Sequence, residues 1–343
     1  MPPAKAKNDK LVSALKALKK LQDKHSGVVE SADLAEAHRA LLVSAGFLRS
    51  VSKGWYVCSN PKDALGDSTA WYASFWAFIS GYLSKRFGKR YCLNAEASLL
   101  LHTGATAVPK QVTAVAKATG NAVLPLPFET SLVVYQDEKR VPRARADVRG
   151  LQALTLPEAL CRTMPGFYVS NPREVEIALA QIRDVSQLLS ILLEGDGLLA
   201  SAGRLAGALK RAGREDEADR LVGTMQQAGF KVTATNPFEK GFFPTLGYSR
   251  ERSPYILRLK SMWAGWREEV LAVFPPVPGV PADVDGYLQQ VQERYLSDAY
   301  NSLSIEGYQV TDELIERVAR NAWSPQDNPE DKESRDAMAA RGY

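Results

Sequence analysis

Cysteine is scarce in this chain, which has three among 343 residues. Cys58, Cys92 and Cys161 are far apart in the sequence, and no two of them form a Cys-x-x-Cys pair. An odd number of widely spaced cysteines supports neither a disulfide framework nor a zinc site. This cysteine usage predicts a protein of the reducing cytoplasm.

Long apolar runs are also missing. The sequence has no run of eighteen apolar residues, and no charged leader that passes into an apolar core. We therefore expect neither a membrane-spanning helix nor a signal peptide, and no membrane partner. Hydrophobic residues make up 45% and charged residues 24%, ordinary values for a soluble globular protein, and the length suggests two or three domains.

Motifs that would mark an enzyme are absent as well. The sequence contains no phosphate-binding G-x-x-x-x-G-K-[ST], no G-x-G-x-x-G after a strand, no H-E-x-x-H and no G-x-S-x-G. His25, His38 and His102 are scattered, and His102 falls at the apolar end of a predicted helix, where a histidine is more often a core or capping residue than a catalyst. The sequence gives no positive evidence that this chain carries out a reaction by itself.

Positive charge is present, and it gathers at the start of the chain. The net charge is +4, and the first 24 residues hold seven lysines against two aspartates. Residues 9–24 have leucines at helical spacing, a second helix capped by Ser31 ends near Gly46, and a short hairpin follows. Helix, helix and hairpin within residues 1–60 is the order of a winged helix.

A winged helix can bind double-stranded DNA, which would place Arg39 of the second helix and Arg49 and Lys53 of the hairpin against the duplex. The same module can serve protein contacts, or its lysine-rich face can simply be solvated. Glu36 on the second helix opposes DNA binding. The sequence leaves these alternatives open.

The middle of the chain, residues 61–232, predicts an α+β domain. Its first helix carries six aromatic residues at spacings of three and four, which favours a buried helix over a surface that stacks on bases. A strand and a helix capped by Asn94 come next, then short strands over 109–150 that predict a small mixed or antiparallel sheet, then a series of helices from Thr155. The whole chain is predicted to be α+β and predominantly helical.

Residues 233–284 predict a linker with one helix, and residues 285–343 predict C-terminal helices. A helical stripe there runs into the sequence SLSIEG, which holds Ser302, Glu306 and Gly307. Ser302 and Glu306 lie one helical turn apart, and Gly307 suits the left-handed position after a helix. A carboxylate at such a junction is well placed to meet an arginine, although an exposed glutamate at a helix end is also common.

The sequence SLSIEG resembles the (S/T)xxxE(G/N) inhibitory motif of Fic family proteins. That resemblance implies that Glu306 pairs with an arginine of a Fic catalytic loop and blocks productive placement of the ATP γ-phosphate. Stretches farther back, among them YCLNAEASLLLHTGATAVPKQ, are similar to the N-terminal region of some bacterial Fic proteins. The part up to Phe230 is similar to AbiEi-type antitoxins, which have an N-terminal winged helix.

The Fic signature HxFx(D/E)GNGRxxR is absent, so no catalytic residue is carried over, and ATP and Mg²⁺ are implied only for a missing Fic core. We expect a regulatory front part of a longer protein, a truncated product, or a separately encoded piece. It would restrain a Fic AMP-transferase core in cis or in trans, and a homodimer is compatible with this role. The alternative is a DNA-binding antitoxin or autorepressor.

Overall fold

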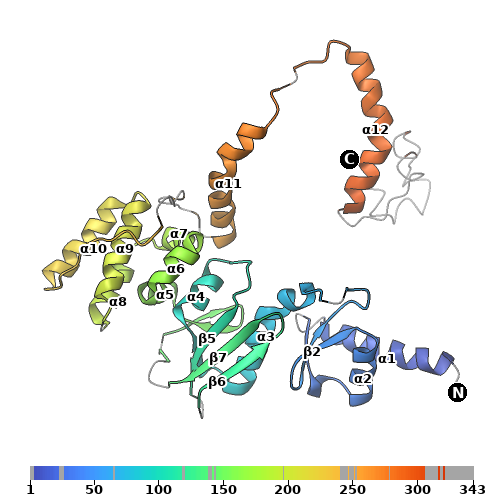
Figure 1. The fold of residues 1–343 in the computed structure, drawn as a ribbon, viewed down its shortest axis with the longest axis horizontal. Coiled ribbons are helices and arrows are strands. Elements are labelled where there is room, and N and C mark those ends of the chain that lie inside the picture. Colours follow the sequence, from blue (N-terminus) through green and yellow to red (C-terminus); the bar gives the residue numbers. More distant parts are fainter. Residues whose placement is uncertain are drawn as a thin grey trace, which may run out of the picture. The chain divides into compact units, whose positions relative to one another are not determined.

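The computed structural model describes residues 4–22, 27–64, 66–117, 120–137, 141–142, 144–195, 197–239, 246, 251, 253–277, 279–305, 316 and 320. Within them the chain is an α+β protein that is predominantly helical, as the sequence predicts (Figure 1). It divides into two compact units, Met1–Glu268 and Glu269–Tyr343.

The N-terminal module has the element and strand order of a winged helix. Its three strands pair antiparallel in the order β1-β3-β2. Helix α1 packs on α2, and its Ala14 and Leu18 share a core with Leu42 of α2 and Leu48 of β2. The elements are α1 (Ala4–Gln22), β1 (Val28–Glu30), the 3-10 turn η1 (Ser31–Asp33), α2 (Glu36–Ser44), β2 (Leu48–Ser52) and β3 (Trp55–Cys58).

The second helix begins later than the sequence predicts. The sequence predicts Ser31 as its cap, but residues 31–33 form η1 instead, and α2 starts at Glu36 after Ala35. The backbone N–H of Glu30 donates to Asp33 Oδ2 at 2.9 Å, which closes the tight turn locally. The first turn of the predicted second helix is therefore a separate 3-10 turn, and the α-helix itself is shorter than predicted.

A mixed sheet forms the centre of the next region, with strand order β4-β5-β7-β6. Strands β5 and β7 are parallel, while the other two pairs are antiparallel, which confirms a mixed sheet. The aromatic helix α3 is buried through Trp71, Phe75 and Phe78, so its prediction as a core helix is confirmed. The elements are α3 (Thr69–Phe87), β4 (Tyr91–Leu93), β5 (Gln111–Ala116), β6 (Ala122–Leu126), β7 (Thr130–Gln136), β8 (Ala146–Val148) and β9 (Leu151–Ala153).

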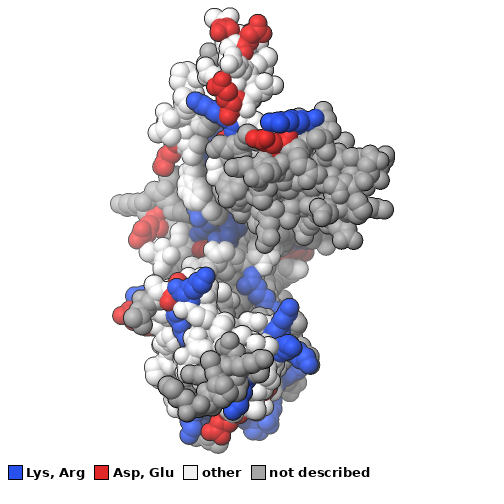
Figure 2. All heavy atoms as spheres, turned by 90° about the vertical axis from the view of Figure 1, so that its right-hand side faces the viewer, with Lys and Arg blue, Asp and Glu red and all other residues white. Residues whose placement is uncertain are grey.

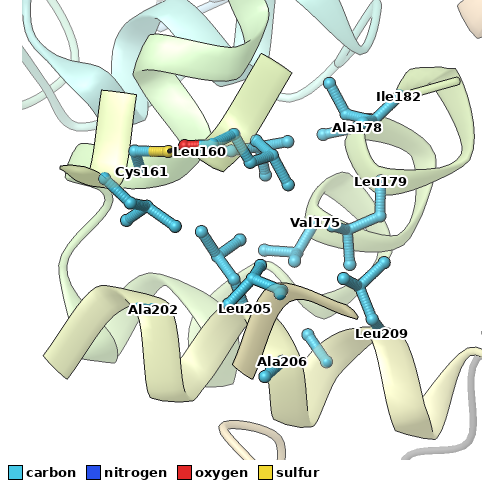
Figure 3. Close-up of a cluster of buried hydrophobic side chains, with 14 of the residues drawn as sticks. Leu160, Cys161, Val175, Ala178, Leu179, Ile182, Ala202, Leu205, Ala206 and Leu209 are labelled. Carbon is cyan, nitrogen blue, oxygen red and sulfur yellow. Dashed lines mark hydrogen bonds between the residues drawn. The ribbon is translucent and has the colours of Figure 1, made fainter. Parts of the chain in front are cut away.

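Short helices pack around a second core. Asn94 caps the first of them, because its Oδ1 accepts from the Ala97 N–H at 3.1 Å. Figure 3 shows Leu160, Val175 and Leu205 meeting from three of these helices. The helices are α4 (Ala95–His102), α5 (Leu156–Arg162), α6 (Pro165–Ser170), α7 (Pro172–Gln181), α8 (Ser186–Glu194), α9 (Leu199–Arg211) and α10 (Glu215–Gln227).

The start of the predicted linker packs against α9. The Thr235 N–H donates to Gly203 O at 3.0 Å, and the side chain of Phe238 is buried beside Tyr168. A Cβ atom on Gly207 would lie 1.9 Å from Thr235 O, so only glycine fits there. We call residues 231–239 the strap. Helices α11 (Pro254–Val273) and α12 (Val284–Ile305) follow.

Candidate functional site

The described residues contain no catalytic centre of a familiar kind. No group of three histidine, cysteine or acidic residues among them is placed to hold a metal ion. His102 is largely enclosed, with Nε2 at 2.8 Å from Leu154 O, and burial lowers the pKa of its ring. It is a satisfied core histidine, as its position in the sequence indicates, while His25 lies outside the described residues.

The cysteines are poor nucleophiles in this fold. Cys92 and Cys161 are buried, and the loss of hydration raises the pKa of each thiol to about 12. The pKa of Cys58 is also raised by burial. Because the thiolate is the reactive form, these side chains are built for packing.

Of the predicted DNA contacts, Arg39 is turned toward its own module. Its Nη1 donates to Ser31 O at 2.8 Å, and its guanidinium lies 5.9 Å from the centre of the Tyr56 ring. Arg39 thereby joins α2 to η1 and β3. The exposed side chains of α2 are mainly small or acidic, and Glu36, Ala37, Ala40 and Val43 are among them.

Arg49 also binds within the chain. Its Nη1 donates to Asp67 O at 2.9 Å, and its Nη2 lies 3.8 Å from Asp63 Oδ2, so it fastens the connector after β3. Lys53, in the turn between β2 and β3, is exposed. Of the three predicted contacts, therefore, two are occupied with protein oxygens and one faces solvent.

Exposed positive charge on this module comes chiefly from α1. Lys10, Lys16, Lys19 and Lys20 are all exposed there. Figure 2 shows lysine and arginine side chains gathered on the N-terminal module, with few acidic side chains between them. The number of lysines near the start of the chain predicts this basic surface. The side chains of Arg39 and Arg49 add little to it, because both bind oxygens of their own chain.

The inhibitory motif falls mostly outside the described residues. Helix α12 continues to Ile305, so the backbone of Ser302 lies in its last turn. Glu306 and Gly307 lie beyond the described part. Their assignment stays a prediction from the sequence.

A hollow of about 640 Å³ lies beside the start of α4. Its charged groups are already in use: Glu96 Oε1 accepts from the Met164 N–H at 2.9 Å, and Arg162 Nε donates to Glu158 Oε1 at 2.6 Å. The first contact holds α4 to the loop after α5, and the second lies within α5. They form no acid, base and nucleophile arrangement.

Comparisons with protein-family models and with curated proteins found no match to this chain. Among the described residues, no helix combines the length and the apolar character that crossing a bilayer requires.

Proposed function

We propose that this chain is a non-catalytic regulatory region that restrains a Fic-type protein AMP-transferase core. The observation that carries the proposal is the sequence order Ser302, Glu306, Gly307, in which the backbone of Ser302 lies in the last turn of the long helix α12. Helix α12 runs unbroken from Val284 to Ile305, which supports a helical position for the serine, four residues before the glutamate in the sequence. The buried thiols and the core position of His102 support a role without chemistry on the described part of the chain.

The proposed restraint is a competition for an arginine of the core. A carboxylate at Glu306 would accept charge-assisted hydrogen bonds from that guanidinium, which the γ-phosphate of ATP otherwise engages. ATP and Mg²⁺ belong to the core in this proposal. The residues of this chain supply only the competing negative charge.

The test joins the chain to a Fic core, in cis or in trans, and follows transfer of labelled AMP. Glu306→Gly should raise labelling about tenfold or more, because hydrogen bonds to charged groups contribute ~1.5–3 kcal/mol. Glu316→Gly, ten residues farther on, is the matched control and should leave labelling near the unmodified level. Equal labelling with and without the Glu306 change would sink the proposal.

DNA binding is the second candidate function, as an antitoxin or autorepressor. The winged-helix strand order and the exposed lysines on α1, together with Lys53, support it. Replacing Lys16, Lys19 and Lys53 with alanine should weaken binding to promoter DNA of its own operon and flatten its salt dependence. No preference for that DNA over unrelated duplex, with no effect of the lysine changes, would remove this candidate.

A further inference from the structure

A hollow of about 550 Å³ opens beside β1, an edge strand of the three-stranded N-terminal sheet. Its walls include Val28 and Glu30 on β1 and Arg149 in the turn between β8 and β9. Helix α3 forms its floor, where the small residues Ala73 and Ala77 lie one helical turn apart. These short side chains leave the space that the hollow occupies.

The pairing of β1 with β3 shows which backbone groups of β1 point away from β3. At the two ends of β1, Gly27 O accepts from a backbone N–H of β3, and the Ser31 N–H donates to the turn before β3, both at 2.8 Å. In an antiparallel ladder, bonded and non-bonded residue pairs alternate. The register therefore makes Val28 and Glu30 non-bonded positions, whose N–H and C=O groups are directed to the open edge.

Most of these edge groups have no partner among the described residues. The Glu30 N–H donates to Asp33 Oδ2 at 2.9 Å. The Val28 N–H, the Val28 carbonyl and the Glu30 carbonyl make no described hydrogen bond. An edge of this kind can pair with a further strand.

Two other edges in the described structure carry features that hinder such pairing. The opposite edge of the N-terminal sheet, β2, has a register shift between Ser50 and Ser52. The edge strand β6 of the mixed sheet contains Pro125, which has no N–H to donate. Strand β1 has neither a bulge nor a proline, so its edge is open to pairing.

The hollow suits one extended segment better than a second copy of this chain. Strand β1 has three residues, which gives an edge about 10 Å long. The turn between β8 and β9 borders the hollow, and Ser80 Oγ on α3 donates to Gly150 O of that turn at 3.0 Å. A second copy would bring the α3 that packs on its own β1, whereas a single strand would lie over α3 beside Trp76.

The charges around the hollow indicate the chemistry of that segment. Arg149 Nη2 donates to the neutral hydroxyl of Tyr255 at 2.5 Å, and no described carboxylate pairs with this guanidinium. At the β1 side, Lys85 Nζ pairs with Glu30 Oε2 and neutralises it. The side of the hollow formed by Arg149 therefore favours a carboxylate from a partner.

We propose that this hollow binds an extended segment of a partner protein as a fourth strand beside β1, with apolar side chains on α3 and a carboxylate against Arg149. Main-chain bonds to Val28 and Glu30 would supply affinity, and the side chains would supply specificity. This surface is separate from the inhibitory motif, and its role does not depend on DNA binding.

The test uses the full chain and fluorescently labelled, capped peptides. Acetyl-Thr-Val-Thr-Val-Thr-Glu-amide should bind about tenfold more tightly than the same peptide ending in lysine, and Arg149→Glu should reverse that preference. Successive N–H groups of a strand point to opposite sides. N-methylation of both valines or of two threonines should therefore abolish binding for one set and spare it for the other.

A bulky side chain should block the hollow. Ala73→Trp should weaken binding about tenfold or more, because the indole takes the place of the segment. The matched control is Ala37→Trp on the exposed face of α2, which should leave the affinity unchanged. Circular dichroism and thermal melting check that each variant folds.

Several outcomes would overturn the proposal. They are absence of binding at millimolar peptide, equal affinity for the glutamate and lysine peptides, and equal loss from the two N-methylated sets. Dimers in sedimentation that Ala73→Trp dissociates would show a second copy in the hollow, and would overturn it as well.

Discussion

Arg258 on α11 donates from Nη2 to Glu174 Oε1 on α7 at 3.0 Å, and the same nitrogen lies 3.2 Å from Thr103 O at the end of α4. Both charged side chains are largely buried, at 12% and 14% exposed. One guanidinium therefore joins three helices that are distant in the sequence. These bonds fix the start of α11 against α4 and α7.

Removing one partner of this pair should destabilise the protein strongly. Glu174→Ala leaves the guanidinium without its counter-charge, and we expect a loss of about 2–4 kcal/mol in the free energy of unfolding, measured with urea. The double variant Glu174→Leu with Arg258→Met should recover part of that loss, because no buried charge is then left unpaired. A Glu174→Ala protein as stable as the original would contradict this account.

The strap gives a prediction in which two glycine substitutions act in opposite directions. Gly207→Ala places a Cβ 1.9 Å from Thr235 O and 2.9 Å from Asn236 N, so the strap must move. We expect a loss of about 1–3 kcal/mol, the usual cost of overpacking, with faster proteolysis within residues 231–239. Gly223→Ala on α10 has no atom within 4 Å of the new Cβ and should gain up to about 1 kcal/mol.

Because His102 is shielded from water, we expect the folded protein to lose stability at mildly acidic pH. Burial lowers its folded pKa below the ordinary value of 6.5, so the unfolded chain binds the proton more readily. The contribution of the neutral ring to the free energy of unfolding is complete above pH 6.5. It is lost as the pH falls toward the pKa of the ring in the folded protein. In urea unfolding at pH 7.5 and 5.5, the original protein should lose more stability than His102→Gln; an equal loss would show that the ring contributes nothing.

Thiol labelling should follow burial. With pKa values of about 12, Cys92 and Cys161 carry almost no thiolate at pH 8 and are also shielded from reagent. A disulfide reagent should therefore label Cys58 first in the folded protein and all three thiols in guanidinium. Rapid labelling of a Cys58→Ser variant before unfolding would show that one of the buried thiols is accessible.

Local patterns in the sequence determined several elements because their causes are local. The aromatic residues of α3 recur at helical spacing, and that spacing alone places Trp71, Phe75 and Phe78 on buried positions. Asn94 caps α4 through a bond to a residue three positions away. These features need only the geometry of one helix.

Long-range contacts decided what local patterns left open. An arginine that reaches DNA and one that binds a carbonyl of its own module look alike in sequence, and the fold directs Arg39 to Ser31 and Arg49 to Asp67. Likewise, the strap has the composition of a linker. It packs because Gly203 and Gly207, four residues apart, leave a groove on α9.

By itself, the sequence determined the α+β class, a small sheet that was either mixed or antiparallel, and the buried aromatic helix, while the role of Ser302, Glu306 and Gly307 stays a prediction. The tertiary structure decided which basic side chains bind oxygens of their own chain, as Arg39 and Arg49 do, and which are exposed, as Lys53 is. The physical reason is that periodicity and capping depend on neighbours within a few residues. Hydrogen-bond partners such as Glu174 for Arg258 are fixed only when distant segments meet.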